Sequence, residues 1–118
     1  MQHLLGLEQL NRDQLAGLLE SARRFVGVGR EQAKRADLAG KVVANLFYEP
    51  STRTKLSFSL AARRLRADTL DFSPSGSSTA KGESFIDTAR NIEAMGVDAV
   101  VVRHASAGAP HLLTQHLR

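Results

Sequence analysis

Short apolar runs alternate along this chain with longer stretches whose hydrophobic residues recur at helical spacing. The apolar runs, which are short and partly β-branched, predict strands at 41–47, 69–72 and 99–102. The amphipathic stretches predict helices at 11–26, 52–66 and 84–95, and a last helix that begins near Pro110. Asn11 is a suitable N-cap for the first helix, and Gly27 and Gly29 are expected to end it.

Helices and strands therefore alternate from the first element to the last. This order predicts one α/β domain over residues 1–118, with a parallel sheet that is flanked by helices on both faces. Ligands of such sheets bind at the carboxyl ends of the strands. Polar clusters follow the predicted strands: Ser51–Thr54, the Ser/Gly-rich loop 73–83, and Arg103-His104.

Net charge, cysteine content and the length of the apolar runs exclude some functional classes but do not identify a function. The 118 residues carry a net charge of +4, which suits an anionic partner. The chain has no cysteine, so it offers no disulfide framework and no thiolate metal site. It shows no signal peptide, and no apolar run approaches the roughly 20 residues that span a bilayer. We therefore expect a cytoplasmic protein without membrane contact.

The segment Ser51-Thr52-Arg53-Thr54 opens the second predicted helix and is the clearest candidate site. One hydroxyl is enough for an N-cap, but this helix start carries three. A cation in the first turn opposes the helix dipole by about 0.3–1 kcal/mol, and a bound dianion reverses that penalty. Free N–H groups, hydroxyls and a guanidinium at one point favour a phosphate group as ligand.

Two further segments are candidates for contact with the same anion. Arg103-His104 follows the third predicted strand and is either an ordinary pair of polar residues that leave a sheet or a site where Arg103 offers a second guanidinium. The loop Ser77-Ser78-Thr79-Ala80-Lys81-Gly82-Glu83 offers Lys81 and a serine, or else is a plain polar loop. It is not a nucleotide P-loop, because the Walker pattern needs Gly-Lys followed by Ser or Thr.

Other binding classes receive less support from the residues. The second predicted helix is basic, which also occurs at nucleic-acid interfaces, but it lacks interleaved aromatic residues for base stacking. We therefore expect no nucleic-acid partner and interpret most of these cations as a solvated face. The histidines His3, His111 and His116 have no recognisable metal-ligand spacing, so we expect no metal.

Taken together, these residues resemble the N-terminal, carbamoyl-phosphate-binding half of aspartate carbamoyltransferase catalytic chains. The matching stretches are NLFYEPSTRTKLSF, the SSTAKGES loop and DTARNIEAMGVDAVVVRH. The STRT element is common to carbamoyltransferases in general. The KGES loop and the VVRH strand end look like the aspartate enzymes rather than the ornithine enzymes.

The resemblance implies transfer of a carbamoyl group from carbamoyl phosphate to L-aspartate, in pyrimidine biosynthesis, without a cofactor. It implies that Ser51, Thr52, Arg53 and Thr54 bind the phosphate, that Thr54 reaches the carbamoyl oxygen, and that Arg103 contacts phosphate and carbonyl. Arg53, Thr54 and Arg103 are then the catalytic residues. His104 is not expected to be catalytic.

The resemblance also implies shared sites in a homotrimer. Ser77, or its neighbour Ser78, and Lys81 would reach into an adjacent subunit's site, and Glu83 would help to hold their loop. Whether regulatory chains associate is left open.

The family pattern continues beyond Arg118, with a histidine near the carbamoyl oxygen and an aspartate-binding domain. We therefore expect residues 1–118 alone not to catalyse the transfer, and carbamoyl aspartate formed by that purified chain would contradict this. Two alternatives stay open: a carbamoyltransferase with another acceptor such as ornithine, and a non-catalytic basic module that binds anions or nucleic acid.

Overall fold

The computed structural model describes residues 2–74 and 85–117. Within it the chain forms two compact units, residues 1–34 and residues 35–118, which we describe separately. In the described residues, no helix is both long enough and apolar enough to cross a membrane.

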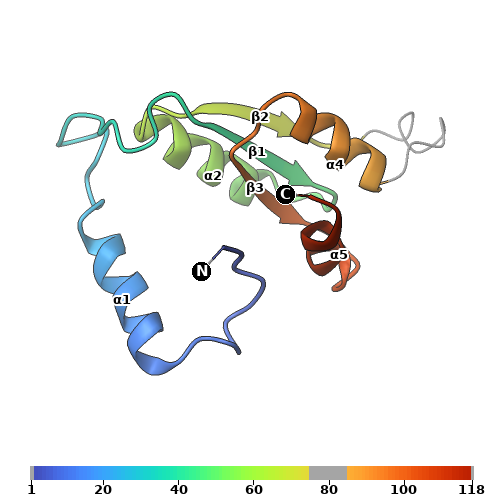
Figure 1. The fold of residues 1–118 in the computed structure, drawn as a ribbon. Coiled ribbons are helices and arrows are strands. Elements are labelled where there is room, and N and C mark those ends of the chain that lie inside the picture. The colour runs from blue at the N-terminus through green and yellow to red at the C-terminus, as the bar shows by residue number, and fades with distance from the viewer. Residues whose placement is uncertain (1, 75–84, 118) are drawn as a thin grey trace. The chain divides into compact units, whose positions relative to one another are not determined.

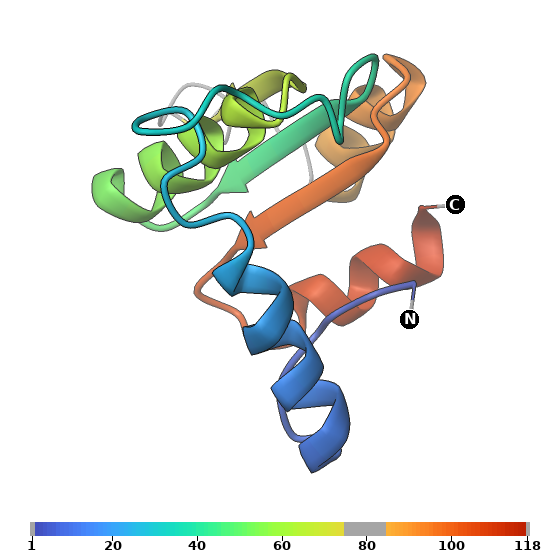
Figure 2. The same ribbon diagram turned by 90° about the vertical axis from the view of Figure 1, so that its left-hand side faces the viewer.

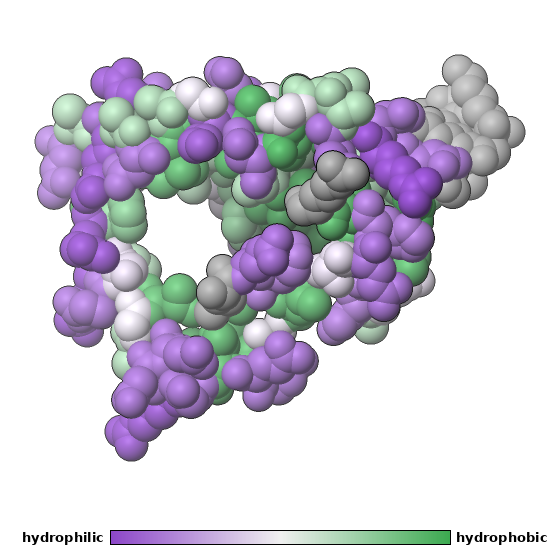
Figure 3. Space-filling model, in the orientation of Figure 1, coloured by the Kyte–Doolittle hydropathy of each residue, from purple (hydrophilic) through white to green (hydrophobic). Residues whose placement is uncertain are grey.

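The N-terminal unit contains one helix, α1, at Arg12–Arg23. Asn11 is its N-cap as predicted, in a capping box where Gln14 N–H donates to Asn11 Oδ1 and Asn11 N–H donates to Gln14 Oε1. The prediction that this helix reaches residue 26 is wrong, because the chain turns after Arg23 and Gly27 adopts a φ of +82°. No residue of α1 is buried. Figure 3 shows the face of the whole protein seen in Figure 1, on which hydrophobic and hydrophilic residues are interspersed.

The second unit is built on a parallel sheet of β1 (Val42–Phe47), β2 (Asp68–Phe72) and β3 (Ala99–Arg103). The strand order is β2-β1-β3, so β1 lies in the centre (Figure 1). Five of the six residues of β1 are buried, as the apolar run predicted. The three predicted strands are confirmed, with ends that differ by one residue.

Helices cover both faces of the sheet, and the alternation of side chains along β1 shows how. Val43 packs with Ala62 of α2 (Thr52–Arg64). Ala44 and Leu46 point the other way and pack with Ile92 of α4 (Phe85–Ala94). Figures 1 and 2 show α2 and α4 on opposite sides of the strands. The predicted α/β fold is therefore confirmed.

The last helix, α5, spans Ala109–His116 and has Pro110 in its first turn, as predicted. Helix α2 ends two residues earlier than predicted. After Arg64 the chain reverses at Arg66, which has a left-handed φ of +66°, and Ala67 N–H donates back to the Ala62 carbonyl. This turn brings the chain directly into β2.

Candidate anion-binding site

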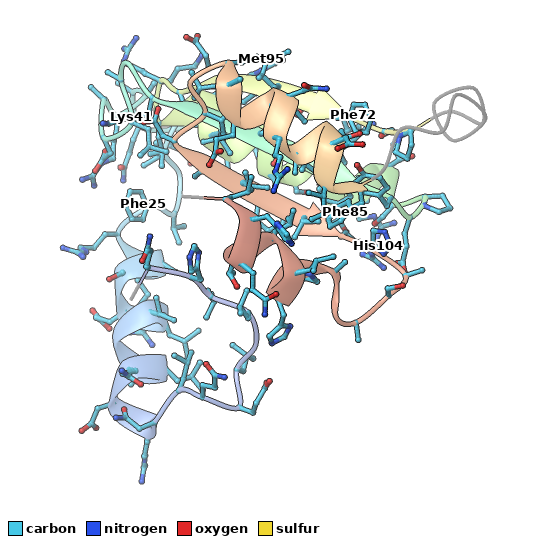
Figure 4. All side chains as sticks on the ribbon, turned by 45° about the vertical axis from the view of Figure 1, so that its right-hand side comes forward. Phe25, Lys41, Phe72, Phe85, Met95 and His104 are labelled. Carbon is cyan, nitrogen blue, oxygen red and sulfur yellow. The ribbon has the colours of Figure 1, made fainter. Side chains whose placement is uncertain are left out.

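The carboxyl ends of β1 and β3 lie side by side and bring two predicted site segments together. Phe47 is paired with Arg103, and Tyr48 N–H donates to the Arg103 carbonyl over 2.7 Å, which continues the ladder past the end of β1. Arg103 is thereby held beside the turn that leads into α2. Figure 4 shows His104 and Phe85 at this end of the sheet and Lys41 at the other.

The Arg103 guanidinium contacts two side chains of that turn. Its Nε donates to Glu49 Oε2 over 3.0 Å and its Nη1 donates to Ser51 Oγ over 3.1 Å. The Arg103 side chain remains 46% exposed and that of Glu49 35% exposed. The arginine is therefore oriented by two partners and still accessible to a ligand.

Ser51 is the N-cap residue of α2, but its hydroxyl makes no capping hydrogen bond. It accepts from Arg103 instead. The first turn of α2 contains no acidic residue, whereas α1 has both a capping box and Asp13 in its first turn. An α-helix leaves its first four N–H groups without partners inside the helix, and its dipole favours negative charge there. The start of α2 is thus electrically suited to an external anion.

A pocket of about 350 Å³ opens beside this helix start. It lies between the end of β1, the first turn of α2 and the end of β2. The residues that line it are Phe47, Tyr48, Glu49, Pro50, Ser51, Thr52, Lys55, Ser73 and Pro74. Two predicted site residues, Ser51 and Thr52, therefore face a cavity large enough for a phosphate group.

The other predicted residues fall into two groups. Arg53 and Thr54 lie in the first turn of α2, where Arg53 is exposed and Thr54 is half-buried. Ser77 and Lys81, with the alternative Ser78 and with Glu83, lie outside the described residues. The structure therefore brings Ser51, Thr52 and Arg103 together and places Arg53 and Thr54 on the same helix turn.

Two residues at the site were missed by the sequence analysis. Glu49 pairs with Arg103, and Lys55 Nζ donates to Ser73 Oγ over 2.8 Å at the rim of the pocket. The only local signal for Glu49 was an acidic residue beside a cluster of cations and hydroxyls. Its partner is 54 positions away, so no local pattern could identify the pair.

His104 lies in a cluster of aromatic rings and does not line the pocket. Its ring packs against Phe85, with centroids 4.9 Å apart, and against Tyr48 at 5.0 Å. Its Nδ1 accepts from the Ser106 N–H over 2.9 Å. Arg103 is the last residue of β3 and reaches Ser51, while His104 follows the strand and packs beside Phe85 of α4.

The described residues contain no cluster of three or more His, Cys, Asp or Glu side chains arranged to hold a metal ion. What they do contain is a helix start with two hydroxyls beside a small pocket, and the Arg103 guanidinium, which donates to one of those hydroxyls. Such donors bind a phosphoryl group and stabilise negative charge that develops on it.

Residues 2–117 match the model of the family described as aspartate/ornithine carbamoyltransferase, carbamoyl-P binding domain. The chain belongs to this family. The match covers the helix start at Ser51 and the strand end at Arg103, so it spans every part of the site described above.

Curated relatives agree with this assignment. The chain is 51% identical over 118 residues to the aspartate carbamoyltransferase catalytic subunit of Myxococcus xanthus, and 53% identical over 116 residues to that of Rhodopirellula baltica. It covers 39% and 34% of those two proteins. The chain therefore spans little more than a third of the length of these carbamoyltransferases.

Solved structures of the family have the same fold. The catalytic subunit of M. jannaschii aspartate transcarbamoylase superposes with a TM-score of 0.90 at 37% identity, over 100% of this chain and 40% of that one. The Trypanosoma cruzi enzyme, solved with carbamoyl phosphate and aspartate, superposes with a TM-score of 0.83 at 28% identity, over 99% and 36%.

Proposed function

We propose that this chain supplies the carbamoyl-phosphate-binding part of an aspartate carbamoyltransferase. The observation that carries the proposal is the uncapped start of α2, where the Ser51 hydroxyl is turned to Arg103 and a pocket opens beside it. The relatives are aspartate enzymes, which supports L-aspartate rather than ornithine as the acceptor.

In this proposal the phosphate of carbamoyl phosphate binds at the first turn of α2. Ser51, Thr52, Arg53 and Thr54 donate to it. The aspartate amine attacks the carbonyl carbon, the carbonyl oxygen gains negative charge, and the carbon–oxygen bond to phosphate breaks as the leaving phosphate takes up the amine proton. Thr54 and Arg103 stabilise that charge, which is larger in the transition state than in the ground state. The step needs no cofactor and no side-chain nucleophile.

The remaining parts of the proposal concern assembly and location. Ser77 and Lys81 act in the site of an adjacent subunit, so the working enzyme is a homotrimer. Lysine suits this role because it delivers a compact charge on a flexible stem. We place the enzyme in the cytoplasm, in pyrimidine biosynthesis.

Titration calorimetry with inorganic phosphate tests the proposed site. Arg53→Ala should weaken phosphate binding by about 1.5–3 kcal/mol, the value of a charge-assisted hydrogen bond. Arg64→Ala is the matched control, because it removes the same charge from the last turn of the same helix. Equal binding by the wild type and Arg53→Ala would remove Arg53 from the site. Equal losses in both variants would indicate a diffuse electrostatic effect instead of a site.

A further inference from the structure

Helix α2 is joined to strand β2 and to Ser73, the residue after that strand, by three side-chain hydrogen bonds at regular intervals. Lys55 Nζ donates to Ser73 Oγ at 2.8 Å, Ser59 Oγ to Asp71 Oδ2 at 3.0 Å, and Arg63 Nε to Thr69 Oγ1 at 3.3 Å. Along the helix the positions advance by four residues, and along the strand they retreat by two. We call this set the polar ladder.

The regular spacing follows from the geometry of the two elements. Four helical residues rise about 6.0 Å, and two strand residues rise about 6.6 Å. Residues four apart share one face of a helix, and residues two apart share one face of a strand. A helix antiparallel to a strand can therefore form such bonds at successive intervals, but only in one axial register. Figure 1 shows α2 lying alongside the sheet.

The middle rung extends into the core. Asp71 accepts from Ser59 with one carboxylate oxygen and from Asn45 Nδ2 with the other, over 2.8 Å. Asn45 is fully buried in the central strand, and Ser59 is 5% exposed. Asp71 itself is exposed on the edge strand, and Asn45 Oδ1 has no hydrogen-bond partner among the described residues. The buried Asn45 amide nitrogen and the Ser59 hydroxyl both find their partner in Asp71, so this rung links β1, β2 and α2.

The apolar contact between α2 and the sheet cannot fix that register by itself. On the helix side the buried apolar residue of this cluster is Ala62, a small side chain, which packs with Val43 of β1 and the half-buried Val101 of β3. Apolar burial is non-directional, whereas hydrogen bonds lose strength within a few tenths of an ångström. The register matters at the helix start, because Ser51 must lie within hydrogen-bond reach of Arg103 on the sheet.

We propose that the polar ladder positions the anion site, and that Ser59, with its acceptor Asp71, is the main positioning residue. The ladder sets how far α2 extends along the sheet, and hence where its first turn lies relative to Arg103. This inference rests on the function proposed above. It assigns a role to Ser59 and Asp71, which do not line the pocket.

The test compares three single variants and one double variant by phosphate calorimetry, well below the unfolding temperature. Ser59→Ala removes the middle rung, and alanine's high helix propensity favours a folded protein. Thr69→Val removes the last rung without a change in shape. Ser57→Ala is the matched control, because its hydroxyl donates to the Arg53 carbonyl within its own helix and not to β2.

We expect Ser59→Ala to weaken phosphate binding about threefold and the double variant Ser59→Ala/Thr69→Val about tenfold, since small displacements of binding groups are costly. Ser57→Ala should bind like the wild type. The NMR resonance of Arg103 Nε–H, which reports the contact with Glu49, should shift in the variants that remove a rung of the ladder and not in Ser57→Ala. A role in stability only would lower the urea midpoint without changing affinity or this resonance.

The outcomes separate the two proposals. If Arg53→Ala loses binding while Ser59→Ala and the double variant bind like the wild type, the ladder inference is overturned and the proposed function stands. The ladder inference is also overturned if Ser57→Ala loses as much affinity as Ser59→Ala. If the wild type does not bind phosphate, both proposals fail.

Discussion

Glu49→Gln tests whether the Glu49 carboxylate competes with the anion for Arg103. In the structure this carboxylate accepts from Arg103 Nε over 3.0 Å while Nη1 contacts Ser51. Both side chains of the ion pair are more than a third exposed, so the pair itself contributes little to stability. A dianion at the start of α2 would feel repulsion from Glu49. We therefore expect Glu49→Gln to bind phosphate more tightly.

The size of the effect follows from the geometry. Glu49 and a bound anion would each form a hydrogen bond of about 3 Å with the Arg103 guanidinium, so the carboxylate oxygen would lie about 6 Å from the anion. At an effective dielectric constant of about 60, the repulsion between a unit charge and a dianion is about 1.8 kcal/mol at that distance. Salt with a Debye length of about 8 Å halves it to about 0.9 kcal/mol. Phosphate should then bind about fivefold more tightly to Glu49→Gln.

The assay is phosphate titration at two salt concentrations, with Asp37→Asn as the control. Asp37 pairs with Arg35 over 2.7 Å and has the same 35% exposure as Glu49, but it precedes β1 at the other end of the sheet. The gain for Glu49→Gln should shrink as salt rises, and Asp37→Asn should bind like the wild type. Weaker binding by Glu49→Gln would refute the reasoning and show that Glu49 holds Arg103 in place for the anion.

Two further predictions concern stability and are measured by urea unfolding. Arg66 has a left-handed φ of +66°. That conformation costs a residue with a side chain about 1–2 kcal/mol, so Arg66→Gly should stabilise the fold by a net of about 0.5–1 kcal/mol; destabilisation would show that the Arg66 side chain makes a stabilising contact. Leu46 is fully buried in β1 and packs with Ala44 and Ile92. Leu46→Ala should cost about 3 kcal/mol, and a loss below about 1 kcal/mol would mean that the core collapses around the deletion.

The sequence alone was sufficient for the element types and their order. The run 41–47 contains consecutive apolar residues, and a strand buried on both faces needs that pattern wherever it occurs in a fold. The helix boundaries were less predictable. Helix α1 stops at Arg23 and α2 at Arg64, because backbone turns at Gly27 and Arg66 redirect the chain. The turn at Arg66 had no sequence signal, since glycine is the usual residue in that conformation.

The anion site was predicted only in part. Hydroxyls and a guanidinium at a helix start are a local pattern, so Ser51 to Thr54 stand out in the amino-acid sequence itself. Arg103 was a candidate from its position after a strand, and the resemblance to carbamoyltransferases added its contact with the carbonyl group. Neither source pointed to Glu49 as its partner.

By itself, then, the sequence determined what is local: strands from apolar runs, helices from their spacing, and a helix start rich in anion donors. Tertiary structure decided what joins distant residues. Ser51 and Arg103 are 52 positions apart, and Asn45 and Asp71 are 26 apart. Their contacts depend on strand register and on the axial position of α2, and these are set by the packing and hydrogen bonds of the whole sheet at once.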